Sequence, residues 1–186
     1  MQLTTMEIKS QLVNDKISRL DRVVYYRLFF IIVAIAATMD RLTKWLVQIY
    51  LPYGTYDEAS MVEVIPHFFY ICHIGNTGAA WGMFHGQSFF LAIFSGVALA
   101  LLYFFRKGLG LRNINVQLTL GLVSGGILGN LYDRLAYNHV VDFLDFHLGF
   151  YRWPAFNVAD SCILIGVLLF SWFSFQEEAA RKSSKA

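Results

Sequence analysis

Long apolar segments alternate with short polar ones along most of this chain. Four segments approach the length of a membrane-spanning helix, roughly 20 mostly apolar residues. They cover about residues 23–50, 87–105, 113–132 and 157–176. The second and third contain no charged residue, and the only charge in the fourth is Asp160. The pattern therefore predicts four transmembrane helices.

The first of these segments has two interpretations. Its apolar part ends at Met39, and it then continues as an amphipathic helix pattern through Asp40 and Lys44 to about Tyr50. The small residues "AIAA" at 34–37 resemble a signal-peptide cleavage site. However, the flank before the apolar part is long and holds acidic as well as basic residues, and the helix pattern runs past the supposed cut. We therefore expect a retained helix.

The basic residues predict the orientation of these helices. Eleven of the 15 lysines and arginines lie at the start of the chain up to Arg27, between the second and third segments, or after the fourth. Because lysine and arginine concentrate on the cytoplasmic side, both termini are expected to be cytoplasmic. All five histidines, and the acidic residues from Asp40 to Asp160, lie in the outer loops or at the outer ends of the helices. Any polar site is thus expected to open outward.

The outer segments have strand-like sequences. Residues 61–76, "MVEVIPHFFYICHIGN", and residues 139–146, "HVVDFLDF", are rich in β-branched and aromatic side chains, which are typical of strands. The predicted fold is an all-α integral membrane protein of four transmembrane helices, with a small β-sheet and loops on its outer face. A polar extension, residues 1–22, and a polar tail, residues 177–186, flank the membrane domain of residues 23–176.

Composition supports the membrane class. Hydrophobic residues make up 56% of the chain and charged residues 15%, whereas soluble domains carry about 25% charged residues. A net charge of +2 gives no sign of nucleic-acid binding. Cys72 and Cys162 have no ligand-like spacing, so we expect small apolar core residues and no disulfide framework, metal site or cofactor.

Two aspartates are candidates for chemistry. Asp142 and Asp160 are 18 residues apart, on either side of a short loop. The loop must fold back for the last helix to re-enter the membrane, so the two carboxylates can meet. Two close carboxylates in an apolar site share a proton. Such a pair suits hydrolysis, because one carboxylate can take a proton from water while the other donates one.

Other polar residues cluster near the outer ends of the helices. In "DRLTK", Asp40 and Lys44 are four residues apart, which suits either a structural ion pair or support for a nearby site. In "SGGILGNLYDR", Asn130, Asp133 and Arg134 share one helix face. An interface cluster of Asp133 with Arg134 is the alternative there, although it does not account for Asn130 one turn further in.

Two more motifs flank these helices. "HIGNTGAAWG" contains Asn76 and Gly78 before the second helix, where a turn-forming asparagine is the simple alternative. "FNVADS" opens the fourth helix, where Asn157 suits an N-cap and Asp160 an acidic first-turn residue. An ionisable residue at membrane depth is nevertheless a functional candidate.

Other hydrolytic chemistries lack their motifs. Ser124 in "LVSGG" has no glycine two residues before it, so it misses the GxSG pattern of rhomboid proteases. There is no HExxH zinc motif, and the pair His139 and Asp142 does not make a metal site. A proton-coupled transporter and a structural membrane subunit are the competing classes. A transporter predicts polar residues on both sides of the membrane midplane, and a structural subunit does not explain the outer polar cluster.

Five sequence blocks in order, "DRLTK", "NTGAAWG", "GGILGNLYDR", "VVDF" and "FNVADS", resemble the lipoprotein signal peptidase (signal peptidase II) family over about residues 25–175. The resemblance implies an aspartyl protease of the bacterial cytoplasmic (inner) membrane. It would remove signal peptides from prolipoproteins by cutting before a cysteine that carries diacylglycerol. Its implied partners are these prolipoproteins and membrane lipids, with no metal, cofactor or nucleic acid.

The resemblance also assigns roles to residues by their place in the blocks. It implies that Asp142 and Asp160 form the catalytic pair. Asp145 lies outside the core pattern. The blocks further imply substrate-binding or supporting roles for Asn76, Gly78, Asn130, Asp133, Arg134, Asn157, Asp40 and Lys44.

Overall fold

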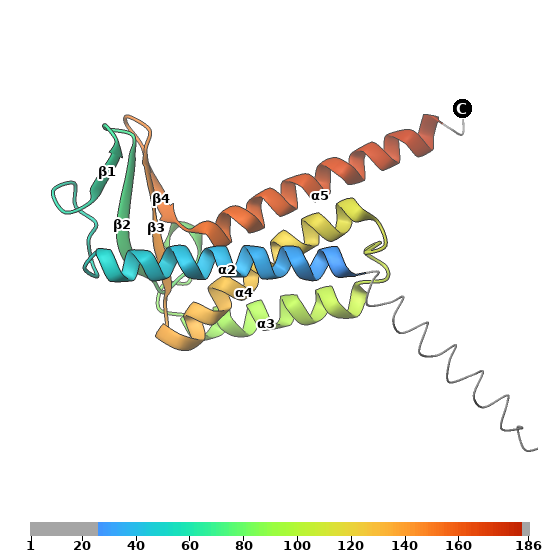
Figure 1. Cartoon of the computed structure of the whole chain (residues 1–186), viewed down its shortest axis with the longest axis horizontal. Coiled ribbons are helices and arrows are strands. Elements are labelled where there is room, and N and C mark those ends of the chain that lie inside the picture. The colour runs from blue at the N-terminus through green and yellow to red at the C-terminus, as the bar shows by residue number, and fades with distance from the viewer. Residues whose placement is uncertain (1–25, 184–186) are drawn as a thin grey trace, which may run out of the picture.

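The computed structural model describes residues 26–183, which form a helical bundle with a small sheet at one end (Figure 1). The predicted extension at residues 1–22 lies outside the described residues. The long helices are α2 (Arg27–Tyr50), α3 (Ser88–Phe105), α4 (Ile114–Tyr137) and α5 (Val158–Ser183). The strands are β1 (Val62–Ile65), β2 (Phe69–Asn76), β3 (Val140–His147) and β4 (Arg152–Phe156), with a 3₁₀ turn at Ala80–Gly82.

Helix α4 is the centre of the bundle, because it packs against α2, α3 and α5. Glycines allow this close approach. A Cβ atom at Gly125 would stand 2.6 Å from the Cβ of Ala36 on α2. A Cβ at Gly166 of α5 would stand 2.7 Å from Cγ2 of Val123 on α4. The glycine-rich sequence of α4 thus fixes how near its neighbours lie.

Three of the described helices, α3, α4 and α5, are long and apolar enough to cross a membrane. Helix α2 carries Asp40, Arg41 and Lys44, so its crossing stays a prediction, as does the location of both termini in the cytoplasm. Two of those charges, Asp40 and Lys44, are fully buried. Helix α5 continues through residues 177–183, which were predicted to be a polar tail, and leaves the bundle there (Figure 1).

The sheet confirms the predicted strand segments. Its four strands are antiparallel in the order β1-β2-β3-β4, and they run across the direction of the helices (Figure 1). Helix α4 ends at Asn138, whose φ of 60° turns the chain into β3, and asparagine tolerates this left-handed conformation. Strand β4 then leads into α5. The β3–β4 hairpin therefore connects the two most closely packed helices at the sheet end of the bundle.

Candidate active site

The first turn of α5 orients one of the two candidate aspartates. The side-chain Oδ1 of Asn157 accepts a hydrogen bond from the backbone N–H of Asp160 at 3.0 Å. In return, Oδ2 of Asp160 accepts one from the backbone N–H of Asn157 at 3.3 Å. This reciprocal arrangement is a capping box, which satisfies two otherwise unpaired donors at the start of a helix. The predicted N-cap and first-turn acid are confirmed.

The amide of Asn157 also reaches the second aspartate. Its Nδ2 donates to Oδ1 of Asp142 on β3 at 2.7 Å. The other carboxylate oxygen of Asp142 accepts from Nδ2 of Asn76, at the end of β2, at 2.9 Å. Asp160 receives a further hydrogen bond on Oδ1 from Nδ2 of Asn130 on α4, at 2.8 Å. The structure thus brings Asp142 and Asp160, from a strand and a helix, into one hydrogen-bond network.

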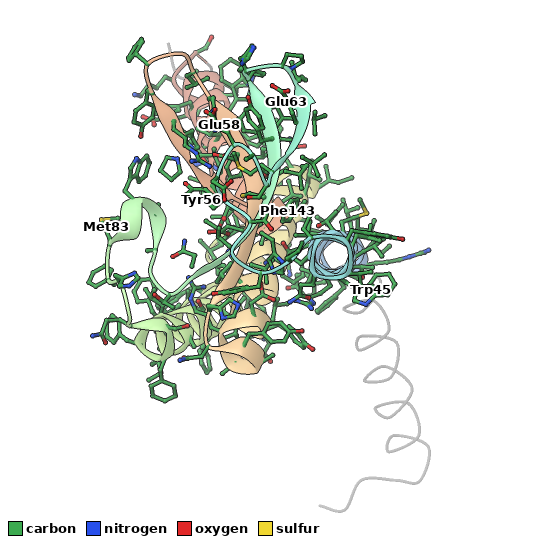
Figure 2. All side chains as sticks on the ribbon, turned by 90° about the vertical axis from the view of Figure 1, so that its left-hand side faces the viewer. Trp45, Tyr56, Glu58, Glu63, Met83 and Phe143 are labelled. Atoms are coloured by element: carbon green, nitrogen blue, oxygen red, sulfur yellow. The ribbon has the colours of Figure 1, made fainter. Side chains whose placement is uncertain are left out.

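A cavity of about 210 Å³ lies against this network. Asp142 and Asn76 form part of its wall, and the turn at Ala80–Gly82 faces them. In Figure 2, Tyr56 lies on the sheet side, and Met83 lies on the loop across from it. Sequence reasoning missed several residues that line this cavity, since aromatic and small residues in a loop give no functional signal: Tyr56, Trp81, His85, Pro154 and Ala155.

Burial changes the protonation of Asp142, whose side chain is 1% exposed. Burial, followed by the nearby charge of Asp160, raises the pKa of Asp142 from 3.8 to about 7. The amide donors of Asn76 and Asn157 and the charge of Lys44 act in the opposite direction. A carboxyl group in this position holds its proton close to neutral pH, which suits a group that must both give and take a proton.

Lys44 is the centre of a buried charge cluster that contacts the aspartate network through Asn130. Its Nζ is 2.8 Å from Oδ2 of Asp40 and 2.8 Å from Oδ2 of Asp133, and all three side chains are fully buried. The same ammonium donates to Oδ1 of Asn130 at 2.9 Å. Because the Asn130 oxygen faces Lys44, its NH₂ group is directed at Asp160. The predicted Asp40–Lys44 pair is therefore present, and it extends to α4.

The carboxylates that pair with Lys44 also hold the backbone next to each candidate aspartate. Asp133 accepts a hydrogen bond from the N–H of Val141 at 3.2 Å, one residue before Asp142. Asp40 accepts one from the N–H of Ala159 at 2.9 Å, one residue before Asp160. Both halves of the site are therefore anchored to one buried charge cluster.

Arg134 fixes the loop that carries Asn76. Its Nη2 donates to the carbonyl oxygen of Gly78 at 3.1 Å. The N–H of Gly78 in turn donates to Oδ1 of Asn76 at 2.9 Å, so Asn76 also forms the turn that its sequence suggested. A Cβ atom at Gly78 would stand 2.6 Å from the carbonyl oxygen of Met83, so the close approach of these two backbone segments requires glycine. Asp133 pairs with Arg41 and Lys44 of α2, whereas its neighbour Arg134 donates to the carbonyl oxygens of Asn130 and Gly78.

Asp145, which was left out of the predicted pair, has a separate set of partners, Arg152 and His147. Within residues 26–183, no three His, Cys, Asp or Glu side chains are grouped so that they could hold a metal ion.

Comparisons with known proteins agree with this geometry. The family model described as signal peptidase (SPase) II matches residues 32–176. A lipoprotein signal peptidase of Symbiobacterium thermophilum is 41% identical over 145 residues, which cover 77% of this chain and 91% of that protein. One from Bacillus pumilus is 36% identical over 141 residues, which cover 76% and 88%.

A solved structure also matches. It is described as a bacterial membrane enzyme, and it superposes with a TM-score of 0.73 at 33% sequence identity, covering 82% of this chain and 90% of that one. The residues matched by the family model include the whole aspartate network. The chain belongs to the signal peptidase II family.

Proposed function

We propose that this protein is an aspartyl endopeptidase of the bacterial inner membrane. It removes signal peptides from diacylglyceryl-modified prolipoproteins by cutting just before the lipidated cysteine. One observation carries the proposal: the carboxylates of Asp142 and Asp160 both accept hydrogen bonds from Asn157, one from its side-chain amide and one from its backbone N–H, and Asp142 lines an open cavity. Family membership supplies the substrate class.

In the proposed reaction the two carboxylates share one proton. The ionised carboxylate takes a proton from a water molecule, whose oxygen attacks the scissile carbonyl carbon. The protonated partner gives its proton to the developing oxyanion. When the tetrahedral intermediate collapses, the C–N bond breaks and the leaving amine receives a proton from the pair. The near-neutral pKa of Asp142 supports this exchange, because neither protonation state is strongly favoured at cellular pH.

The surrounding amides keep the pair in a fixed geometry. Asn157 and Asn76 bind the two oxygens of Asp142, and Asn130 binds one oxygen of Asp160. These donors limit the rotation of both carboxylates, and catalysis is sensitive to displacements of about 1 Å. The remaining residues support the backbone and the cavity loop in this proposal: Asp40, Lys44, Asp133, Arg134 and Gly78.

The location of the site fits a substrate anchored in the membrane. Asp142 lies on β3 and Asp160 lies in the first turn of α5, and Figure 1 shows that α5 starts at the sheet end of the bundle. Three apolar helices extend from that end. A prolipoprotein that carries diacylglycerol at its cysteine presents the scissile bond at the membrane surface, and it can reach this end of the bundle without leaving the bilayer.

Cleavage by purified variants tests the proposal. Asp142→Asn and Asp160→Asn should each lower turnover of a diacylglyceryl prolipoprotein by about 100-fold or more, because each removes a group that transfers a proton. Glu178→Gln, which changes an exposed carboxylate on α5, should retain activity. Near-normal turnover in either aspartate variant would show that the pair is misassigned. If the wild-type protein cuts neither the lipidated substrate nor its unlipidated form, the proposed activity itself is wrong.

A further inference from the structure

Asp145 is a fully buried carboxylate that the proposed chemistry does not use. Its partner is Arg152, at the start of β4. The guanidinium Nε lies 3.0 Å from Oδ1 and 3.1 Å from Oδ2 of Asp145, and Nη2 lies 2.5 Å from Oδ2. An arginine fork that binds both oxygens of a carboxylate is a strong and directional pair. It fixes the plane of the Arg152 side chain.

Arg152 uses this fixed position to hold a distant loop. Its Nη2 also donates to the backbone carbonyl of Tyr56 at 3.1 Å, across 96 positions of sequence. The guanidinium carbon lies 3.8 Å from the centre of the Tyr56 ring, a favourable cation–π distance. Both the backbone and the ring of Tyr56 are therefore bound by one side chain.

A second contact ties the same loop to the same carboxylate. Nε2 of His147 is 3.0 Å from Oδ2 of Asp145, and Nδ1 of His147 is 3.8 Å from Oε1 of Glu58. Glu58 follows Tyr56 by two residues in the same loop, and both are labelled in Figure 2. On the other side of Tyr56, the N–H of His73 on β2 donates to the carbonyl oxygen of Thr55, and the N–H of Gly54 donates to the carbonyl oxygen of His73. The loop backbone is thus attached to the sheet, while Arg152 sets the direction of the Tyr56 ring.

The Tyr56 ring matters because it lines the same cavity as Asp142. We propose that Asp145 and Arg152 are positioning residues that hold Tyr56 as a substrate-contacting wall beside the aspartate pair, so that they determine how tightly the chain around the scissile bond is bound. This inference rests on the proposed function. It predicts an effect on substrate binding, because no atom of Asp145 or Arg152 takes part in the proton transfers.

The variant Arg152→Lys separates a folding role from a positioning role. Lysine keeps a positive charge against the buried Asp145, but its single ammonium cannot reproduce a planar fork. It therefore loses the contacts with the carbonyl and ring of Tyr56. Tyr56→Ala removes the wall directly and leaves the ion pair in place. Tyr56→Phe is the matched control, because it keeps the ring.

Steady-state cleavage of a diacylglyceryl prolipoprotein is the assay, with unfolding temperatures measured on the same preparations. We expect Arg152→Lys and Tyr56→Ala each to raise KM about ten-fold and to change kcat by less than about three-fold, as for a lost binding interaction. Tyr56→Phe should restore most of the binding that Tyr56→Ala loses, and Glu178→Gln on the exposed part of α5 should match the wild type. In the double variant, Arg152→Lys should add little to Tyr56→Ala, because the two act through one contact.

Two results would overturn the inference. One is a KM close to that of the wild type in both Arg152→Lys and Tyr56→Ala. The other is a double variant whose defect is the product of the two single defects, since Arg152 would then act independently of Tyr56. If Arg152→Lys lowers the unfolding temperature, the Tyr56 variants still decide whether the wall binds substrate. Failure of the wild-type protein to cleave would contradict the proposed function instead.

Discussion

The raised pKa of Asp142 predicts that replacing this residue stabilises the fold at alkaline pH. Burial, followed by the charge of Asp160, raises the pKa of Asp142 from 3.8 to about 7. An unfolded chain releases this proton near the ordinary pKa. Between the two pKa values the unfolded state therefore binds fewer protons than the folded state. The free energy of unfolding falls as pH rises through this window and levels off above about pH 7.

The size of the effect follows from the two pKa values. A difference of 7 − 3.8 = 3.2 units corresponds to about 4 kcal/mol at 1.36 kcal/mol per unit. Asp142→Asn removes this dependence on pH. It also places an NH₂ group against the amide of Asn76 or Asn157, and a buried unpaired donor costs about 1–3 kcal/mol at every pH. The variant should therefore be less stable than the wild type near pH 4 and equally or more stable near pH 8.

Thermal unfolding of both proteins in detergent at pH 4.5 and pH 8 measures this reversal. For a chain of this length 1 kcal/mol corresponds to about 2–4 °C. The unfolding temperature of Asp142→Asn relative to wild type should therefore rise by about 10 °C between the two pH values. Glu178→Gln on the exposed part of α5 should show no such rise. The charged groups that act on Asp142, namely Asp160, Lys44 and Arg134, are the same in both proteins.

One result would refute this reasoning. If the difference between variant and wild type is the same at pH 4.5 and pH 8, to within about 1 kcal/mol, then Asp142 is ionised at an ordinary pKa in the folded protein. The carboxyl group would then not be the shared-proton partner that the proposed mechanism requires.

Three further changes have expected outcomes. Lys44→Met leaves two buried carboxylates without their shared cation and should cost about 3–5 kcal/mol, seen as a lower unfolding temperature together with loss of cleavage. Gly126→Leu places side-chain atoms against the carbonyl oxygen of Ala159, so it should displace the start of α5 and abolish cleavage, whereas Gly96→Leu on open helix surface should not. Burial raises the pKa of Cys72 to about 12, so in a Cys162→Ser background maleimide at pH 8 should label Cys72 only after unfolding.

Local sequence patterns predicted the elements and the first turn of α5. Long, mostly apolar runs without charged residues predicted where α3 and α4 begin almost to the residue. Nothing in residues 87–105 or 113–132 competes with a helix. β-Branched and aromatic runs gave the strands. The capping role of Asn157 could be predicted because its partner, Asp160, is only three residues away. The polar residues 177–183 also continue α5, because a polar sequence can extend a helix, as the Glu178–Lys182 pair does here.

Contacts between distant parts of the chain could not be predicted in the same way. The spacing of Asp40 and Lys44 indicated an ion pair, but not that Asp133 of α4 completes it. No pattern in the sequence around Tyr56 indicates that its ring lies beside Asp142, because that position depends on Arg152, 96 residues later. The resemblance to a family predicted most of the residues that surround the candidate site. It did not say which of them bind one another.

The site has two parts with opposite effects on the stability of the fold. The buried carboxylate of Asp142 lowers stability above neutral pH, and the supporting contacts of Asp133, Asp40 and Lys44 raise it. The burial of Asp142 lowers the free energy of unfolding, because no cation among the described residues contacts its carboxylate directly. If the backbone around it could move, this carboxylate would turn toward water. Asp133 and Asp40 prevent this, since they bind the backbone one residue before Asp142 and one before Asp160. Lys44 offsets the charge of both supports. Variants of the supports should therefore lose stability and activity together, whereas Asp142→Asn should lose activity while gaining stability above neutral pH. A buried carboxylate held in place by rigid neighbours for the proposed chemistry produces this divergence, and a site in which all the buried carboxylates served the fold would not.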